Sequence, residues 1–263
     1  MPKDFRATTL ERAVGRLLAG WRNERGLSLT EGGQRVGFSS AKLSMMENAA
    51  QPSAPVDIMA SGYVYKVPTP EWQVVMVRAQ HAASRRTGMW PEPITLDPAE
   101  DLPLLAAEAS RLRTFTTDTV PSVFQLAEYT AATAQQDDPT KAAPLSCLRE
   151  VWTTRLDNDP LIVEAVFPEA VLRRAVGGRR VMRAQLLHLM EVSERPDVSV
   201  RVLSDLAGAY PAMGCPFTWL SFPRRQHDDV VYIETFLRSE YVEDQPLVAR
   251  VAERFCALST LAL

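Results

Sequence analysis

The sequence predicts an α+β protein in two parts: an all-α domain of five helices, then an α+β domain with a small, mainly antiparallel sheet. Residues 1–84 carry apolar residues at helical spacing, interrupted by glycine or proline. Residues 101–263 alternate helical stretches with short β-rich runs. Residues 85–100 contain a glycine and three prolines but no apolar period, which predicts a linker between the two domains.

Apolar spacing and capping residues predict the N-terminal helices. Apolar residues at positions 10, 14, 17, 18 and 21 form one face of a first helix, and Gly26 ends it. Ser28 and Glu31 have the spacing of a capping box, which begins a second helix that Gly37 ends. Later helices are expected at 40–48, from 55, and from about 70 to 84.

The C-terminal domain shows two kinds of apolar pattern. Helices are expected at 104–113, 124–134, 145–156, 181–192 and 246–261. Strands are expected at 161–167, 198–203, 217–222 and 230–235. This mixture predicts a sheet packed against helices.

Composition excludes several classes of protein. With 263 residues, 46% hydrophobic and 23% charged, the chain has enough apolar sequence for a packed core and is not mainly disordered. No apolar run approaches the ~18 to 20 residues of a membrane helix, and no signal-peptide stretch opens the chain. We therefore expect a cytoplasmic protein without a membrane partner. Three separated cysteines support neither a disulfide framework nor a zinc site.

Charge is distributed unevenly along the chain. Residues 1–66 hold nine basic and six acidic residues, whereas the remainder holds 20 basic and 26 acidic residues. A basic N-terminal segment followed by an acidic remainder is compatible with a polyanion that binds to the N-terminal segment. A net charge of +3 over 66 residues is also common on a solvated surface.

Residues 27–48 have the pattern of a helix-turn-helix: two short helices joined by Gly37-Phe38-Ser39. In DNA-binding proteins the second helix lies in the major groove, with small or polar side chains facing the bases. The residues expected to contact base edges are Ser40, Ala41, Lys42, Ser44 and Met45. Ser28 and Asn48 are placed to contact phosphates. The same turn pattern also occurs in helical domains that never touch DNA.

Short motifs run in order along nearly the whole chain. The N-terminal ones are Val14-Gly15-Arg16-Leu17-Leu18, Trp21-Arg22, Gly26-Leu27-Ser28, Val36-Gly37-Phe38-Ser39 and Lys42-Leu43-Ser44-Met45-Met46-Glu47. With these, the N-terminal part resembles the Xre-type (repressor/Cro-like) DNA-binding domain. The C-terminal ones include Glu108-Ala109-Ser110-Arg111-Leu112-Arg113-Thr114-Phe115, Arg195-Pro196-Asp197-Val198-Ser199-Val200 and Val231-Tyr232-Ile233-Glu234. With these, the rest resembles the antitoxin-like C-terminal regulatory domain of actinobacterial regulators.

The resemblance implies a transcription regulator that binds an inverted-repeat operator in double-stranded DNA as a homodimer. It also implies that the C-terminal domain dimerises or senses a ligand or partner, and that a small acidic protein encoded nearby often acts as that partner. In this fold type Arg22 and Glu47 pair as a partly buried salt bridge, whereas the alternative role for Arg22 is a phosphate contact.

Two features depart from the family pattern. Gly32 and Gly33 stand where the second helix usually has a large aliphatic residue followed by alanine. We expect this helix to be the least stable one unless neighbours fill the space. Met45 stands where an outward arginine is common. Either the operator differs, or DNA binding is weak and partner-dependent, or the N-terminal domain is a relic. The alternative function is an antitoxin-like module that binds a small acidic partner.

Other motifs predict neither catalysis nor cofactor binding. Gly177-Gly178-Arg179-Arg180 lacks the GKS or GKT end of a phosphate-binding loop, and His227-Asp228-Asp229 is explained more simply as a polar turn than as a metal site. No serine has a catalytic signature around it, so we expect no enzyme and no cofactor. Aromatic residues are numerous enough to line a ligand pocket, with Tyr210, Tyr232 and Tyr241 as its predicted polar-tipped residues, although such residues are more often core.

Overall fold

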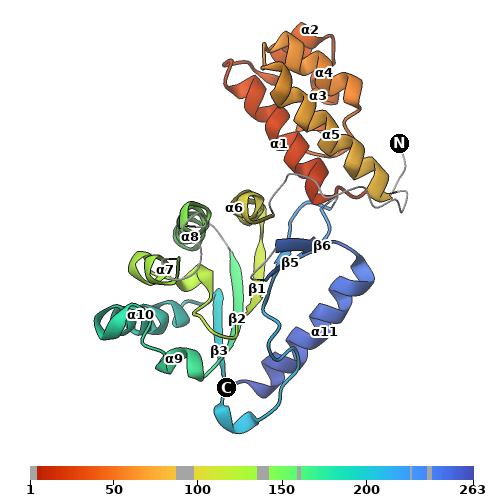
Figure 1. Ribbon diagram of the computed structural model, residues 1–263. Coiled ribbons are helices and arrows are strands. Elements are labelled where there is room, and N and C mark those ends of the chain that lie inside the picture. Colours follow the sequence, from red (N-terminus) through yellow and green to blue (C-terminus); the bar gives the residue numbers. More distant parts are fainter. Residues whose placement is uncertain (1–4, 87–97, 135–141, 159–160, 226, 236–238) are drawn as a thin grey trace. The chain divides into compact units, whose positions relative to one another are not determined.

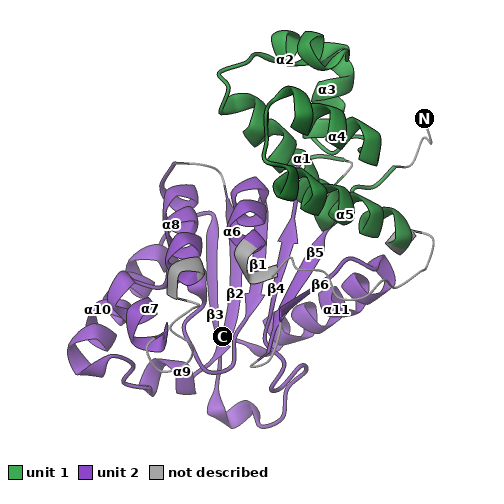
Figure 2. Ribbon diagram, turned by 45° about the horizontal axis from the view of Figure 1, so that its top comes forward, with its two compact units in different colours: residues 1–95, 224–228 green, residues 96–223, 229–263 purple. Residues whose placement is uncertain are grey.

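The computed structural model describes residues 5–86, 98–134, 142–158, 161–225, 227–235 and 239–263 (Figure 1). The chain forms two compact units: unit 1 comprises residues 1–95 and 224–228, and unit 2 comprises residues 96–223 and 229–263 (Figure 2). The predicted fold class, α+β with an all-α N-terminal region, is confirmed. Most of the predicted linker, residues 87–97, lies outside the described residues. Within the described ranges, no helix combines the length and apolar character needed to cross a membrane.

The described part of unit 1 consists of five helices. They are α1 (Thr9–Asn23), α2 (Leu29–Val36), α3 (Ser40–Glu47), α4 (Pro55–Val64) and α5 (Thr69–Arg86). The predicted capping box of the second helix is confirmed: the Ser28 hydroxyl accepts from the Glu31 N–H, and the Glu31 carboxylate accepts from the Ser28 N–H. The helices pack around one apolar core. Helices α1, α3, α4 and α5 contribute buried residues to it, including Val14, Leu18, Trp21, Met46, Ile58, Val75 and Ala79. Helix α2 contributes the partly buried Val36.

Unit 2 is built on a six-stranded sheet with the order β3-β2-β1-β4-β5-β6. The strands are β1 (Arg111–Phe115), β2 (Ile162–Pro168), β3 (Val198–Leu203), β4 (Phe217–Ser221), β5 (Val230–Glu234) and β6 (Ser239–Val242). The pairs β1/β2 and β2/β3 are parallel, whereas β1/β4, β4/β5 and β5/β6 are antiparallel. The sheet is therefore mixed and changes direction at β1.

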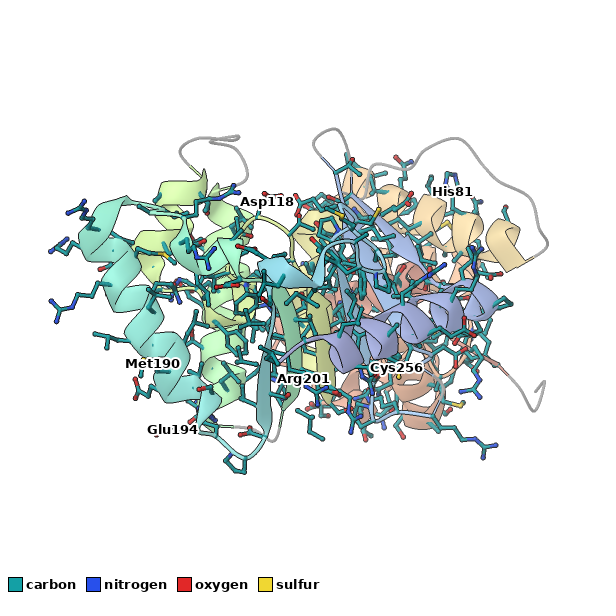
Figure 3. All side chains as sticks on the ribbon, turned by 90° about the horizontal axis from the view of Figure 1, so that it is seen from below. His81, Asp118, Met190, Glu194, Arg201 and Cys256 are labelled. Carbon is teal, nitrogen blue, oxygen red and sulfur yellow. The ribbon has the colours of Figure 1, made fainter. Side chains whose placement is uncertain are left out.

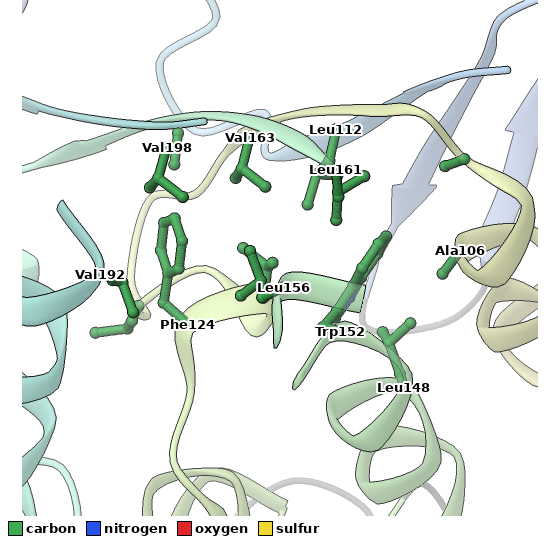
Figure 4. Packing of buried hydrophobic residues seen from close by; sticks show 14 of the residues in the cluster. Ala106, Leu112, Phe124, Leu148, Trp152, Leu156, Leu161, Val163, Val192 and Val198 are labelled. Atoms are coloured by element: carbon green, nitrogen blue, oxygen red, sulfur yellow. The ribbon is translucent and has the colours of Figure 1, made fainter. Parts of the chain in front are cut away.

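Helices cover both faces of this sheet (Figure 1). One face packs against helices that include α6 (Pro98–Glu108), α7 (Ala127–Ala134), α8 (Ala142–Asn158) and α10 (Gly178–Ser193), with the short η1 (Ser122–Phe124) and α9 (Ala170–Arg173) between them. Figure 4 shows the core on this face, where Trp152 and Phe124 lie between the helices and strand residues such as Val163. The other face packs against α11 (Gln245–Leu261); the turn η3 (Asp205–Ala207) follows β3.

The structure differs from prediction at two strands. β1 lies partly within the stretch expected to be helical, because α6 already ends at Glu108. Along β1 the side chains alternate, with Leu112 in the core on the α8 side and Phe115 in the core on the α11 side. β6 has four residues at the edge of the sheet, too few for an apolar period to show.

Gly32 and Gly33 lie where α2 closely approaches its neighbours. A Cβ atom on Gly32 would lie 2.7 Å from Arg22 Cδ and 2.8 Å from Tyr65 Oη. One on Gly33 would lie 2.7 Å from the carbonyl oxygen of Phe38. The packing loss expected in the second helix does not arise at Gly32, because Arg22 and Tyr65 fill the space that an aliphatic side chain would take.

Gly33→Ala is expected to destabilise the protein although alanine favours helices. The gain of about 1 kcal/mol in helix propensity is outweighed by the clash with the Phe38 backbone, since overpacking costs about 1 to 3 kcal/mol or more. We expect a net loss of about 1 to 2 kcal/mol in the free energy of unfolding. Urea denaturation of the full chain measures it, and hydrogen exchange of residues 29–47 assigns the loss to α2 and α3.

Gly20→Ala is the matched control. A Cβ atom at Gly20, within α1, would meet nothing within 4 Å. This variant should be more stable than the wild type by about 0.5 to 1 kcal/mol. Equal or greater stability of Gly33→Ala would show that the close approach of α2 to the following turn is not a constraint.

Candidate functional site

A three-residue turn positions the start of α3. Gly37 ends α2 with φ 86° and ψ 25°, a left-handed conformation that favours glycine. Ser39 then caps α3, its hydroxyl accepting from the Lys42 N–H at 3.1 Å. The direction of α3 is therefore set by one glycine and one cap.

The residues of α3 divide between an inner and an outer side. Leu43 and Met46 are buried in unit 1, as the sequence predicts for inward packing residues. Of the predicted base-contacting residues, Ser40 and Ala41 are exposed, whereas Lys42, Ser44 and Met45 are half-buried. The accessible part of α3 is thus its first turn.

The Lys42 side chain already has partners within unit 1. Its Nζ lies 2.9 Å from Asp57 Oδ1 of α4 and 3.8 Å from the centre of the Phe38 ring. These contacts tie α3 to α4 and to the turn. Sequence reasoning missed the Asp57 contact, because α4 follows α3 after a separate loop and its orientation leaves no local pattern.

The two predicted phosphate contacts also make internal hydrogen bonds. The Ser28 hydroxyl donates to Glu31 at 2.7 Å, and hydrogen bonds from the Ser28 backbone and side chain lower the pKa of that carboxyl. An ionised carboxylate beside Ser28 opposes a phosphate there. Asn48 donates to the Ser44 carbonyl at 2.8 Å, and its amide oxygen accepts from Arg224 of the same unit at 2.9 Å. Both side chains therefore already make hydrogen bonds within unit 1.

Arg22 and Glu47 form a two-pronged ion pair between α1 and the end of α3. Arg22 Nε and Nη2 donate to the two oxygens of Glu47, each at 2.7 Å, and Nη1 donates to the Leu27 carbonyl at 2.6 Å. The side chains are only 12% and 5% exposed. The hydrogen bonds to Glu47 raise the pKa of Arg22, so its guanidinium stays charged.

The three tyrosines predicted to line a pocket do not lie together. The Tyr232 and Tyr241 rings are 5.7 Å apart and pack on the α8 side of the sheet. Tyr210 packs edge-on against Phe115 on the α11 side, with ring centres 6.0 Å apart. Tyr232 borders a pocket of about 350 Å³ whose other lining residues sequence reasoning missed. The one available signal was the polar run Thr116-Thr117-Asp118-Thr119.

Gly177 and Asp229, from two of the remaining motifs, have structural roles. Gly177, with φ 66°, precedes α10, which begins at Gly178. Asp229 accepts hydrogen bonds from Trp219 Nε1 and the Ser221 hydroxyl, both at 2.8 Å. Among the described residues, no group of three His, Cys, Asp or Glu side chains is arranged to hold a metal ion.

Comparison with known proteins gives one result. Residues 99–263 match the family model described as "Domain of unknown function (DUF5753)". No curated protein and no solved structure matches the chain. The match covers all of unit 2 except residues 96–98. It also includes residues 224–228, which belong to unit 1.

Removing either partner of the Arg22–Glu47 pair is expected to destabilise unit 1. Arg22→Met or Glu47→Gln leaves the other group buried without its charge partner, at a cost of about 2 to 4 kcal/mol each. Because the two side chains interact directly, the double variant should lose less than the sum of the singles by about 1 to 3 kcal/mol. Urea denaturation of the four proteins measures this coupling.

Glu24→Gln is the control, because the Arg25–Glu24 pair is on the surface and Glu24 is 68% exposed. It should change stability by no more than about 0.5 kcal/mol. Additive losses at Arg22 and Glu47, accompanied by weaker DNA binding in Arg22→Met, would instead assign Arg22 to a phosphate contact.

Proposed function

Since the chain belongs to the family of the domain of unknown function DUF5753, with an all-helical unit ahead of that domain, we propose that it is a DNA-binding transcription regulator. In this proposal unit 1 binds double-stranded DNA and two copies of the chain act on an inverted-repeat operator. Unit 2 dimerises or senses a ligand or partner. This assignment follows the Xre-type resemblance of the N-terminal motifs.

One observation carries the proposal: the exposed first turn of α3, built from short side chains. Ser40 and Ala41 leave room for a base edge or a phosphate to approach the backbone. The first N–H groups of a helix have no partners within the helix, and the positive end of its dipole attracts phosphate. The Gly37 turn sets the direction of this end, and the Arg22–Glu47 pair anchors the opposite end of α3 to α1.

The partner of Lys42 does not prevent a role in DNA binding. The Lys42–Asp57 pair is partly exposed, and surface pairs of this kind contribute about 0 to 1 kcal/mol. A good contact with a guanine edge is worth about 1 to 3 kcal/mol. Lys42 therefore gains by exchanging Asp57 for a base.

Ala41→Glu is expected to weaken DNA binding at least tenfold at 100 mM salt. The new carboxylate faces the phosphates, whereas an acidic residue in the first turn favours the helix itself, so folding is preserved. The measurement is a gel shift or fluorescence titration on the DNA upstream of the protein's own gene. For the wild type, the logarithm of the affinity should fall linearly with the logarithm of salt concentration.

Gln73→Glu, an exposed substitution on α5, introduces the same charge away from α3 and should bind DNA nearly as the wild type does. Footprinting should show two protected half-sites about one helical turn, ~34 Å, apart. No shift of the wild type at low salt, or equal affinities for the two variants, would contradict the assignment of α3.

A second candidate function is capture of a small acidic protein, and a groove on unit 2 favours it. A hollow of about 300 Å³ lies along α9 and α10, with Leu186, Leu187 and Met190 beside Arg179 and Arg183. Leu187 and Met190 are 57% and 66% exposed, and Figure 3 shows Met190 on α10. Exposed apolar residues edged by arginines suit an amphipathic acidic segment.

In that case the double variant Arg179→Glu/Arg183→Glu should weaken binding of the small acidic protein encoded nearby at least tenfold, because two attractive charges become repulsive. Calorimetric titration of the two purified proteins measures the affinity. Arg250→Glu, at an exposed position of α11, is the control and should have little effect. Unchanged binding by the double variant would remove the groove from this function.

A further inference from the structure

Helix α4 carries apolar side chains on the side that faces away from the core of unit 1. Val56, Met59, Ala60 and Tyr63 are three or four residues apart in sequence and therefore form one face of the helix. The exposed fractions of Val56, Met59 and Tyr63 are 60%, 42% and 81%. Large apolar side chains thus stand in solvent on adjacent turns of a short helix. These four residues are called the α4 stripe below.

The opposite side of α4 is the one that packs within unit 1. Ile58 is fully buried in the core, and Tyr65, the C-cap of the helix, is 2% exposed. A Cβ atom on Gly62 would lie 2.7 Å from Trp72 of α5, so the two helices approach closely there. Packing of α4 in its own unit therefore does not require the α4 stripe. Adjacent exposed apolar residues that folding does not require indicate a contact with another molecule.

The order of side-chain sizes along the α4 stripe fits a second copy of itself. If two α4 helices pack antiparallel across a two-fold axis, position 56 faces position 63 of the second copy, and position 59 faces position 60. Val56 then meets Tyr63, and Met59 meets Ala60. Each bulky side chain faces a smaller one, which lets the two helices interdigitate. Parallel packing would instead set equal residues against each other and leave a gap at Ala60.

The size of this contact decides when it forms. Helix α4 has ten residues, whereas stable interfaces take about 20 to 30 residues from each partner. A contact between two α4 helices alone is therefore too small to join two free copies at low concentration. Two copies bound to neighbouring half-sites of one DNA are at a high effective concentration, at which a weak apolar contact suffices.

Helix α4 is also joined to the helix that the proposed function assigns to the DNA groove. Asp57 of α4 lies 2.9 Å from Lys42 of α3, and both helices belong to unit 1 (Figure 2). A contact between two α4 helices therefore fixes the separation of the two α3 helices. An inverted-repeat operator requires a fixed separation, because its half-sites are about one helical turn apart.

We propose that the α4 stripe is the surface through which two copies of this chain contact each other on DNA, with the two α4 helices antiparallel. This inference rests on the proposed function and names the surface that meets the second copy. Because the contact is apolar, its contribution should change little with salt, whereas binding to phosphates weakens as salt rises.

Disulfide cross-linking tests the contact itself, without DNA. Met59→Cys is made in a full chain whose three native cysteines, Cys147, Cys215 and Cys256, are replaced by serine. In the antiparallel arrangement the two new thiols lie near the two-fold axis, so oxidation of a concentrated solution with copper phenanthroline should give a covalent dimer. Gln73→Cys, at an exposed position of α5, is the matched control and should not cross-link.

DNA titration tests what the contact does. Met59→Glu places two carboxylates at the axis, so it should bind a duplex with both half-sites at least tenfold more weakly than the wild type. Its affinity for a duplex with one half-site should equal that of the wild type, which also shows that it is folded. An equimolar mixture of Met59→Glu and Met59→Lys should recover binding to the two-site duplex, because opposite charges then meet. Gln73→Glu should bind both duplexes as the wild type does.

Two results would overturn the inference: Met59→Cys does not cross-link, or Met59→Glu matches a DNA-binding wild type on the two-site duplex. Loss of the small acidic protein from Met59→Glu, with unchanged binding to both duplexes, would assign the α4 stripe to that protein instead. A wild type that binds neither duplex contradicts the proposed function, and a cross-linked Met59→Cys dimer would still establish the contact between copies.

Discussion

The ion pair between Arg22 and Glu47 is the interaction on which the helical unit depends. It joins the first helix to the end of α3, and a third hydrogen bond from the same guanidinium holds the Leu27 carbonyl ahead of α2. One side chain thus links α1, the end of α3 and the residue that precedes the N-cap of α2. Burying these two charges costs desolvation free energy. The two parallel hydrogen bonds from the Arg22 guanidinium to both oxygens of Glu47 offset that cost. Lysine has no equivalent geometry.

The two glycines of α2 follow from the same arrangement. Arg22 reaches Glu47 across the side of α2, and together with Tyr65 it occupies the space that a side chain at position 32 would need. Position 33 faces the backbone of the turn before α3, where even a methyl group would collide. The loss of the usual aliphatic residue is therefore compensated by neighbours. This argues against the interpretation of the N-terminal domain as a relic, since abandoned packing would leave a cavity at Gly32.

Local patterns predicted the helices of unit 1 well, because helical period, capping residues and glycine stops are all encoded within a few residues. The burial of Leu43 and Met46 against the exposure of Ser40 and Ala41 follows from that period alone. β1 was missed because five residues with mixed polarity, placed directly after a helix, carry too weak an alternation to compete with the helical pattern before them. Asp57, which pairs with Lys42, and Arg224, which donates to Asn48, come from segments outside the motif, so no spacing within it indicates these contacts.

The pocket that Tyr232 borders shows why a site on a sheet is the hardest feature to predict. Thr114 and Thr218 are neighbours only because β4 returns antiparallel to β1, and Tyr232 joins them only through the next pairing. Composition alone pointed to Tyr232 and Tyr241, whereas placing them beside the two threonines required the strand order. The same order explains the separation of Tyr210 from Tyr232: residues that all look suited to a pocket lie on opposite faces of one sheet. In unit 2, topology rather than residue type decides which side chains can share a ligand.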